Sequence, residues 1–435
     1  MHKLLACQGC VNKLMLFTNL SPTQTPPIVA LKFESKLLLL AAVLSAAAAV
    51  SLGVTRFAYG LLLPSMRYDL AWSYTLSGAM NTSNALGYFI GALLTSRVMT
   101  HWGPSRALVW GGLFAALLML VPGFFVDSTV LIVQRLLAGI FSAIIFVSGG
   151  ILAARMGSRQ AERAGLILGL YYGGTGAGIV VSALLVPWIL DRMQLPFAPW
   201  VVAWWVLGVV CLVLVALLRW PVKVLDAWDA GAAAPQGSAQ AVAWWPMRYA
   251  LAGYALFGLG YIGYMTFAVA LLREHGANSA EVTWFYAILG VMVMASSRIW
   301  AGLLNAHRGG GALARLNALL GVAVVLPTLT DNFFVFVASG ALFGAVFLSI
   351  VASTTAFVRL NFPPAAWSAG IAAFTVVFAL GQVVGPLAVG WVADSHGGLV
   401  RGFLYSALAL WAGAVCAWVQ HPVAQRDEAD ASQVL

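Results

Sequence analysis

Long apolar stretches alternate with short polar segments along almost the whole chain. A helix that crosses a bilayer needs about 20 mostly apolar residues, and only helices or closed barrels satisfy the backbone in lipid. Because the stretches are far too long for barrel strands, the pattern predicts an all-α polytopic membrane protein. Its twelve transmembrane helices are expected near 37–63, 73–96, 107–126, 129–154, 164–190, 197–218, 249–272, 282–304, 312–330, 333–358, 365–393 and 402–420.

The polar segments indicate how these helices are grouped. Residues 219–248 contain Pro221, Pro235 and a run of small residues, which is typical of a linker. Near the N-terminus, Thr23 to Pro27 ends in two prolines and is expected to interrupt any helix. The sequence therefore predicts a cytoplasmic N-terminal tail (1–36), an N-terminal six-helix bundle (37–218), a cytoplasmic linker (219–248), a C-terminal six-helix bundle (249–420) and a cytoplasmic C-terminal tail (421–435).

Composition excludes an ordinary soluble domain. Hydrophobic residues make up 62% of the chain and charged residues 9%, whereas a soluble domain carries roughly 25% charged residues. The net charge of +9 could indicate a nucleic-acid partner, but the basic residues are distributed in another way. With the N-terminus inside, 16 of the 23 Lys and Arg lie in expected cytoplasmic segments and four in outer loops. This bias predicts an integral membrane protein with both termini cytoplasmic and no nucleic-acid partner.

The predicted helices contain no Asp, Glu, His or Lys, and their charges are Arg56, Arg135, Arg298 and, at one rim, Arg315. A charge at bilayer depth is costly and is a functional-site candidate by default. Arg56 and Arg135 each lie about seven residues from the outer end of an expected helix, roughly 10 Å deep. They could form an anion-binding pair, or Arg135 could instead bond backbone carbonyls of the first helix. Arg298, near an inner end, is expected to serve in a gate or in packing.

Further candidates for solute contact come from polar and aromatic residues at depth. Gln382 and Asn84 are single polar groups in the eleventh and second helices, and each could instead bond another helix. Aromatic residues follow one face of the seventh helix, where packing alone is the alternative explanation. The predicted substrate-binding residues are Arg56, Tyr59, Asn84, Arg135, Tyr261, Tyr264 and Gln382.

Several motifs carry a resemblance to a known family. Arg135, Gly139 and Ala143 follow the spacing R-x-x-x-G-x-x-x-A in the fourth helix. The chain resembles the major facilitator superfamily from about residue 37 to 420. Its segments Arg56 to Pro64 and Gly381-Gln382 look like those of the uncharacterised bacterial YbfB/YjiJ-like permeases. The resemblance implies a transporter of the bacterial inner (plasma) membrane, in which two six-helix halves expose a central site alternately to either side of the membrane.

The same resemblance implies residues for gating and conformational change. The family's cytoplasmic loop motif normally carries an Asp, whereas Thr95 or Thr100 occupies that position here, and the second-half counterpart ends in Asn305. Its antiporter motif begins in the fifth helix but lacks the expected proline, and the eleventh helix has the better version. The gating set is Gly91, Arg97, Gly103, Arg106, Gly139, Gly174, Gly178, Arg298, Asn305, Gly385 and Pro386.

No motif indicates catalysis or a cofactor. The six His are scattered over loops and tails, and the three glycines after Arg308 lack the Lys of a phosphate loop. The sequence therefore predicts no enzyme, no metal and no cofactor, and a monomer whose partners are a small-molecule solute and the lipid bilayer. The favoured function is secondary active or facilitative transport of a small organic solute, with an anion favoured by the arginines. The alternatives are proton-coupled efflux of drugs or sugars, a non-transporting receptor and a multi-span enzyme.

The lack of titratable carboxylates in the predicted helices bears on energy coupling. Tyr and Arg are not ready proton carriers at neutral pH. A proton could travel with the substrate or on a rim acid such as Asp69 or Glu281, or transport could be uncoupled or driven by exchange. We expect substrate-linked or uncoupled transport.

Reporter fusions at residues 68, 230 and 435 test the predicted topology. The positive-inside bias predicts cytoplasmic signals at 230 and 435 and an external signal at 68. An external signal at 230 contradicts the arrangement of two six-helix bundles around an inner linker.

Overall fold

The structure is a computed structural model that describes residues 27–193, 196–229, 242–395 and 397–423. The chain divides into two compact units, Met1–Leu40 and Ala41–Leu435. Most of the predicted N-terminal tail, the middle of the predicted linker and most of the predicted C-terminal tail lie outside the described residues.

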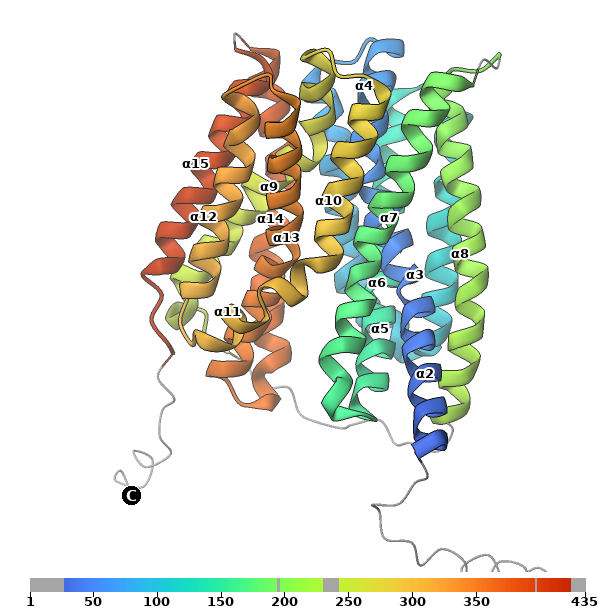
Figure 1. Cartoon of the computed structure of the whole chain (residues 1–435), viewed down its shortest axis with the longest axis vertical. Coiled ribbons are helices and arrows are strands. Elements are labelled where there is room, and N and C mark those ends of the chain that lie inside the picture. Colours follow the sequence, from blue (N-terminus) through green and yellow to red (C-terminus); the bar gives the residue numbers. More distant parts are fainter. Residues whose placement is uncertain (1–26, 194–195, 230–241, 396, 424–435) are drawn as a thin grey trace, which may run out of the picture. The chain divides into compact units, whose positions relative to one another are not determined.

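The described part is almost entirely helical, as predicted (Figure 1). The longer helices are α2 (Pro27–Leu44), α4 (Ala58–Asp69), α5 (Tyr74–Leu118), α6 (Ser128–Ser158), α7 (Ala164–Arg192), α8 (Pro199–Asp229), α9 (Arg248–Glu274), α10 (Ser279–Ile299), α12 (Gly311–Val325), α13 (Phe333–Asn361), α14 (Trp367–Asp394) and α15 (Gly398–Trp418). Short elements are α3 (Ala46–Ala48), α11 (Ala301–Ala306), the π-helix η1 (Ala49–Arg56) and five single 3₁₀ turns. We call η1 and α4 to α8 the N-terminal helices and α9 to α15 the C-terminal helices.

Eleven segments of the described chain are long and apolar enough to cross a membrane, against the twelve expected. The difference arises because the predicted second and third helices both fall within α5, in a 50-residue segment. Inside α5 the backbone leaves the helical region at Gly103, where φ is 74° and ψ is 160°, and Pro104 follows. Glycine tolerates this left-handed φ because it has no Cβ.

Contacts with α6 show that α5 changes direction at this break. Before the break, α5 runs parallel to α6, because Gly87 lies against Leu136 and Gly91 lies against Ile140. After the break, α5 runs antiparallel to α6, because Gly111 lies against Ile144 and the later residue Leu118 accepts a hydrogen bond from the earlier residue Gln134. The two parts of α5 therefore run in opposite directions along one helix.

Three helices extend beyond the predicted membrane spans. α2 begins at Pro27, inside the predicted tail. Proline interrupts a helix at an interior position but is favoured at the first position, where its missing N–H is not needed. α8 continues to Asp229, eleven residues beyond the expected end, with Pro221 inside it. α4 continues to Asp69 with Pro64 inside it. Hydropathy marks the apolar part of a helix, whereas backbone hydrogen bonds extend it into the polar flank.

The first apolar segment contains an eight-residue π-helix, η1, that ends at Arg56. Its wider turn is visible where the amide of Phe57 donates to the carbonyl of Leu52 at 3.0 Å, five residues back. The Thr55 hydroxyl likewise donates to the Val50 carbonyl at 2.7 Å. π-Helical turns interrupt regular hydrogen bonding and often occur at functional sites. Here the irregular stretch is the one that carries the buried arginine.

The N-terminal and C-terminal helices meet through close backbone contacts at glycines. A Cβ on Gly60 (α4) would lie 2.6 Å from the carbonyl oxygen of Met265 (α9), and one on Gly176 (α7) would lie 2.3 Å from that of Gly290 (α10). A Cβ on Gly78 (α5) would lie 2.2 Å from the carbonyl oxygen of Pro386 (α14). Figure 1 shows α7 and α10 side by side between the two sets. Small residues allow membrane helices to approach this closely.

Replacing Gly78 with Ala tests the contact between α5 and α14. The added Cβ would meet backbone that cannot rotate away, so the helices must separate, at a cost of about 1–3 kcal/mol. A lower thermal unfolding midpoint in detergent is expected. Gly173→Ala is the matched control, because nothing lies within 4 Å of its Cβ position. Equal midpoints for the two variants would show that the contact is loose.

Candidate functional site

Arg56 lies at the end of η1 and reaches across to the C-terminal helices. Its side chain is 3% exposed, and its Nη2 donates a hydrogen bond to Oε1 of Gln382 on α14. Gln382 is also 3% exposed. These two predicted site residues, 326 positions apart, therefore form a buried link between the two sets of helices.

Arg56 and Arg135 lie close together on neighbouring helices. Ser51 of η1 is hydrogen-bonded to Ser142 of α6, and Arg135 of α6 donates to the carbonyl of Thr55, the residue just before Arg56. Because residue numbers rise along η1 as they fall along α6, these contacts place the two arginines at a similar level.

Within the described residues, the hydrogen bond and ring contacts of Arg135 are to N-terminal helices. Its Nη1 donates to the carbonyl of Thr55 at 2.9 Å, and its guanidinium lies 4.9 Å from the ring centre of Tyr59. It lines a small hollow with Tyr59, Trp72 and Trp204, where its Nε and Nη2 have no partner among the described residues. The Tyr59 hydroxyl donates to the carbonyl of Ser77 at 2.9 Å. This geometry favours the interpretation in which Arg135 binds the backbone of the first helix.

Two other predicted contact residues also bond within one set of helices. Asn84 donates to the carbonyl of Arg135 at 3.1 Å, where the Gly139 position allows α5 and α6 to touch. The Tyr264 hydroxyl pairs with that of Ser339 at 2.7 Å, and its ring packs on Phe343 with centroids 4.3 Å apart. Neither reaches Arg56 through a hydrogen bond.

Tyr261 belongs to a stack of nearly parallel rings beside Gln382. Its ring lies 4.7 Å from Phe257, 5.6 Å from Phe378 and 5.4 Å from Phe347, with interplanar angles of 16° to 21°. Tyr254 continues the stack on Phe378 at 4.9 Å and 23°. Phe378 is one helical turn before Gln382, so the stack lies directly below the amide that holds Arg56.

Tyr88 is a site residue that the sequence reasoning missed. Its ring centre lies 5.4 Å from the Arg56 guanidinium, within range of a cation–π interaction. It packs against Phe146, which in turn contacts Tyr172. Tyr88 lies one helical turn after Asn84, on a helix face rich in small residues, and this position in the sequence could have identified it.

The predicted gating residues fall into three groups. The glycines make close backbone contacts: Gly91 meets Ile140, Gly174 meets Ser45, Gly178 meets Ala49 and Gly385 meets Leu259. The arginines Arg97, Arg106 and Arg298 are exposed, and Gly103 forms the break in α5. Pro386 packs against Gly78, whereas the side chain of Asn305 lies outside the described residues.

Carboxylates that the sequence analysis did not single out join the helices at the expected outer end. Asp394, the last residue of α14, accepts from the amides of Tyr74 and Thr75 at 2.7 and 2.8 Å and from the Thr75 hydroxyl at 2.6 Å. Glu274, at the end of α9, accepts from the Tyr74 hydroxyl. A carboxylate is favoured at a helix N-terminus such as that of α5. Asp394 and Glu274 therefore link the C-terminal helices to the start of α5.

The rim acids considered for coupling form local hydrogen bonds. Asp69 accepts from Trp200 Nε1 at 2.7 Å, between α4 and α8. Glu281 forms a capping box with Asn278 at the start of α10. Neither spans the two sets of helices through these bonds.

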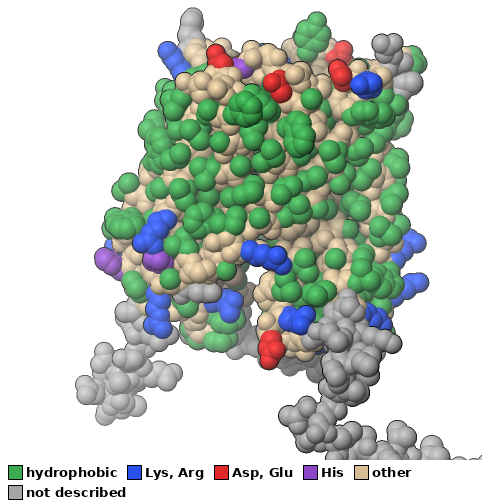
Figure 2. Space-filling view, viewed as in Figure 1, with side chains coloured by type: hydrophobic (Ala, Val, Ile, Leu, Met, Phe, Trp, Pro, Cys, Tyr) green, Lys and Arg blue, Asp and Glu red, His purple; other side chains and the backbone are tan. Residues whose placement is uncertain are grey.

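Further contacts between the two sets lie between Arg56 and this end. Asn81 donates to the Thr266 hydroxyl at 2.5 Å, and the Thr82 hydroxyl donates to the carbonyl of Val383 at 2.7 Å. The Tyr286 hydroxyl donates to the carbonyl of Phe57 at 2.7 Å. Figure 2 shows the surface hollowed at the opposite, lower end, with Lys and Arg side chains at the margin. The site is therefore closed toward the Asp394 end.

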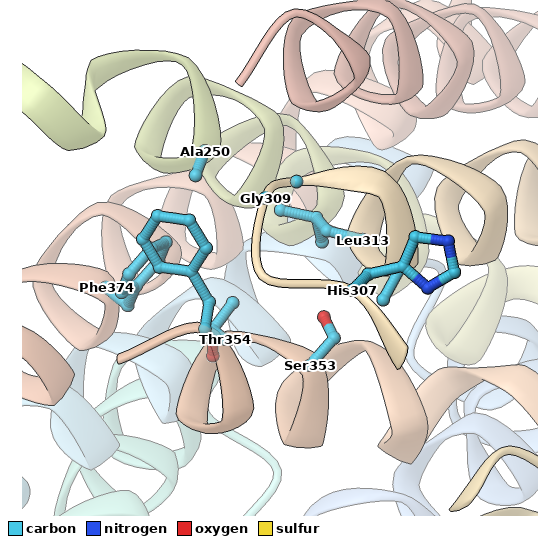
Figure 3. A pocket seen from close by; sticks show the side chains of 10 residues that line it. Ala250, His307, Gly309, Leu313, Ser353, Thr354 and Phe374 are labelled. Carbon is cyan, nitrogen blue, oxygen red and sulfur yellow. The ribbon is translucent and has the colours of Figure 1, made fainter. Parts of the chain in front are cut away.

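Another hollow, shown in Figure 3, lies among α9, α12, α13 and α14 and is lined by His307, Ser353, Thr354 and Phe374. None of the predicted site residues lines it. In the described part of the chain, no three His, Cys, Asp or Glu side chains gather as a metal site.

Comparison with known proteins gives a family and a fold. The sequence matches the family described as "Uncharacterised MFS-type transporter YbfB" over residues 48–418. Among solved structures, a mutant of the nucleoside transporter NupG has a TM-score of 0.64 and 12% identity, over 88% of this chain and 98% of that one. At this identity the likeness concerns the fold alone. No curated protein matches the sequence.

Replacing Asp394 with Asn should weaken closure at its end, because an amide offers one acceptor oxygen in place of two. The measurement is the labelling rate of Thr266→Cys by a membrane-impermeant thiol reagent, in a background without the four native cysteines. Labelling several times faster than in the parent is expected. Asp69→Asn is the control, since its carboxylate bonds within the N-terminal helices. If both variants label at the parent rate, Asp394 does not hold this end closed.

Proposed function

Because this chain belongs to the family described as an uncharacterised MFS-type transporter, YbfB, it is a membrane transporter rather than an enzyme, and we propose that it carries a small organic anion. The proposal includes twelve membrane crossings in two six-helix halves, a monomer in the bacterial inner membrane and cytoplasmic termini. The opposite directions of the two parts of α5 support the count of twelve.

The observation that carries the choice of an anion is the environment of Arg56. Its guanidinium is buried and hydrogen-bonded to a neutral amide, and its Nε has no partner within the described residues. Desolvated charge is costly, and a bound anion would offset that cost. The nearest aromatic neighbours supply cation–π contacts and polarisable surface but no negative charge.

Alternating access follows from where the two sets of helices touch. Hydrogen bonds join them from Arg56 to the Asp394 end, while the surface is hollowed at the opposite end, where basic residues lie (Figure 2). If the basic end is cytoplasmic, the conformer is open inward. An anion entering from that side would compete with Gln382 for Arg56 and thus remove one of the links between the halves.

Energy coupling is expected to be linked to the substrate or absent. Within the described residues no carboxylate is hydrogen-bonded to Arg56, and Asp394 and Glu274 are occupied at the closed end. These acids are suited to hold that end closed. The remaining alternative is a proton carried by one of them during opening.

Arg56→Lys and Arg56→Ala test the anion site. Lys keeps the charge but lacks the planar two-pronged donor, so about tenfold weaker binding is expected, and Ala should abolish it. The readout is counterflow of radiolabelled organic anions in proteoliposomes, with thermal unfolding as the check on folding. Arg192→Ala, at an exposed arginine outside the predicted binding and gating sets, is the control and should transport normally. Normal counterflow by Arg56→Ala would place the substrate elsewhere.

A further inference from the structure

We propose that the anion bound by Arg56 carries a flat aromatic ring, so that the substrate class is aromatic carboxylates. The inference rests on the proposed function and deepens it. Three features of the site carry it: two aromatic walls from different sets of helices, a half-occupied guanidinium edge between them, and several phenol hydroxyls near that edge.

The first wall is the stack that includes Tyr254, Phe257, Tyr261 and Phe378. Its neighbouring rings are tilted by only 9° to 24°, with centroids 4.7 to 5.6 Å apart. Aromatic pairs in protein cores often prefer edge-to-face or offset arrangements. A run of nearly parallel rings gives the wall one common orientation. Phe378 is partly accessible, while Phe257 and Tyr261 behind it are buried.

The second wall comes from the N-terminal helices and consists of Tyr88, Phe146 and Tyr172. Tyr88 is partly accessible, and its ring holds the Arg56 guanidinium at 5.4 Å. In the described residues, no ring contact joins this wall to the stack around Phe378; the ring contacts that cross between the two sets are Phe57 with Phe347 and Tyr74 with Phe267. In the described part of the chain, the two walls therefore do not stack on one another.

The guanidinium edge between the walls is suited to a carboxylate. Nε and Nη2 lie on one edge of an arginine and can donate two parallel hydrogen bonds to the two oxygens of a carboxylate. In Arg56, Nη2 donates to the single oxygen of Gln382 and Nε donates to nothing described. The amide of Gln382 thus occupies half of a two-pronged site. A carboxylate would replace it and satisfy both nitrogens.

The remaining polar groups near this edge are donors rather than negative charges. Tyr88, whose ring lies against Arg56, and Tyr261, whose ring lies against Phe378, bring one phenol hydroxyl from each wall. Such hydroxyls can donate to the carboxylate or to a polar ring substituent. A ring held on Phe378 with its carboxylate on Arg56 uses both halves of the protein at once.

The test is isothermal titration calorimetry of the full-length protein in lipid nanodiscs with three probes. Sodium benzoate carries both features, cyclohexanecarboxylate keeps the charge but has a saturated ring, and benzamide keeps the flat ring without charge. We expect benzoate to bind about tenfold more tightly than cyclohexanecarboxylate and benzamide to bind too weakly to measure.

The variants Phe378→Leu and Tyr88→Leu each remove one wall and should reduce the preference for benzoate over cyclohexanecarboxylate to about threefold or less. Phe114→Leu is the matched control, because Phe114 is exposed and stacks on Trp110 and Phe141 away from the site. Thermal unfolding identifies any variant that fails to fold, and the second wall variant then supplies the answer.

The outcomes separate this inference from the proposed function. Equal affinity for benzoate and cyclohexanecarboxylate overturns the aromatic class and leaves an anion carrier. Benzamide binding as tightly as benzoate overturns the role of the charge. No binding of any of the three overturns both the aromatic class and the carboxylate at Arg56.

Discussion

The hydrogen bond between Arg56 and Gln382 is the contact around which the rest of the site is arranged. A guanidinium buried between membrane helices is costly unless its donors are occupied. Gln382 occupies one of them and comes from the other set of helices. The π-helical turn of η1 brings Arg56 to this position, and the carbonyl of Thr55 just before it is taken by Arg135. The buried charge therefore ties the local backbone of the first helix to the meeting of the two sets.

Arg56 and Arg135 show how similar residues in similar helices acquire different roles. Both are almost fully buried, and both lie against a tyrosine ring. Within the described residues, Arg135 is held by backbone and aromatic rings of the N-terminal helices. This position suits it to stabilise the π-helical turn that ends at Arg56. Arg56 instead faces a partner from the C-terminal helices that a ligand can displace. The difference lies in the neighbours that the fold supplies.

The contacts between the two sets are unevenly distributed. Toward the Asp394 end they include close backbone contact at Gly78 and carboxylate oxygens on the first amides of α5. Backbone contact and charge at a helix terminus are both short-range and geometrically demanding. Such an interface is either made or broken, rather than gradually deformed. At the opposite end, the surface is hollowed (Figure 2).

The sequence by itself determined the fold class, the transporter family and the buried arginines, because hydropathy over about 20 residues and charge within it are local properties. Arg56 and Gln382 could be chosen as rare polar groups in apolar stretches, but not as partners. Their pairing, the rings of Tyr88 and Phe378, and the bonds of Asp394 depend on which helices meet, at which rotation and level. Only tertiary packing decides these relations, because contacts between residues hundreds of positions apart leave no periodic signal in one sequence.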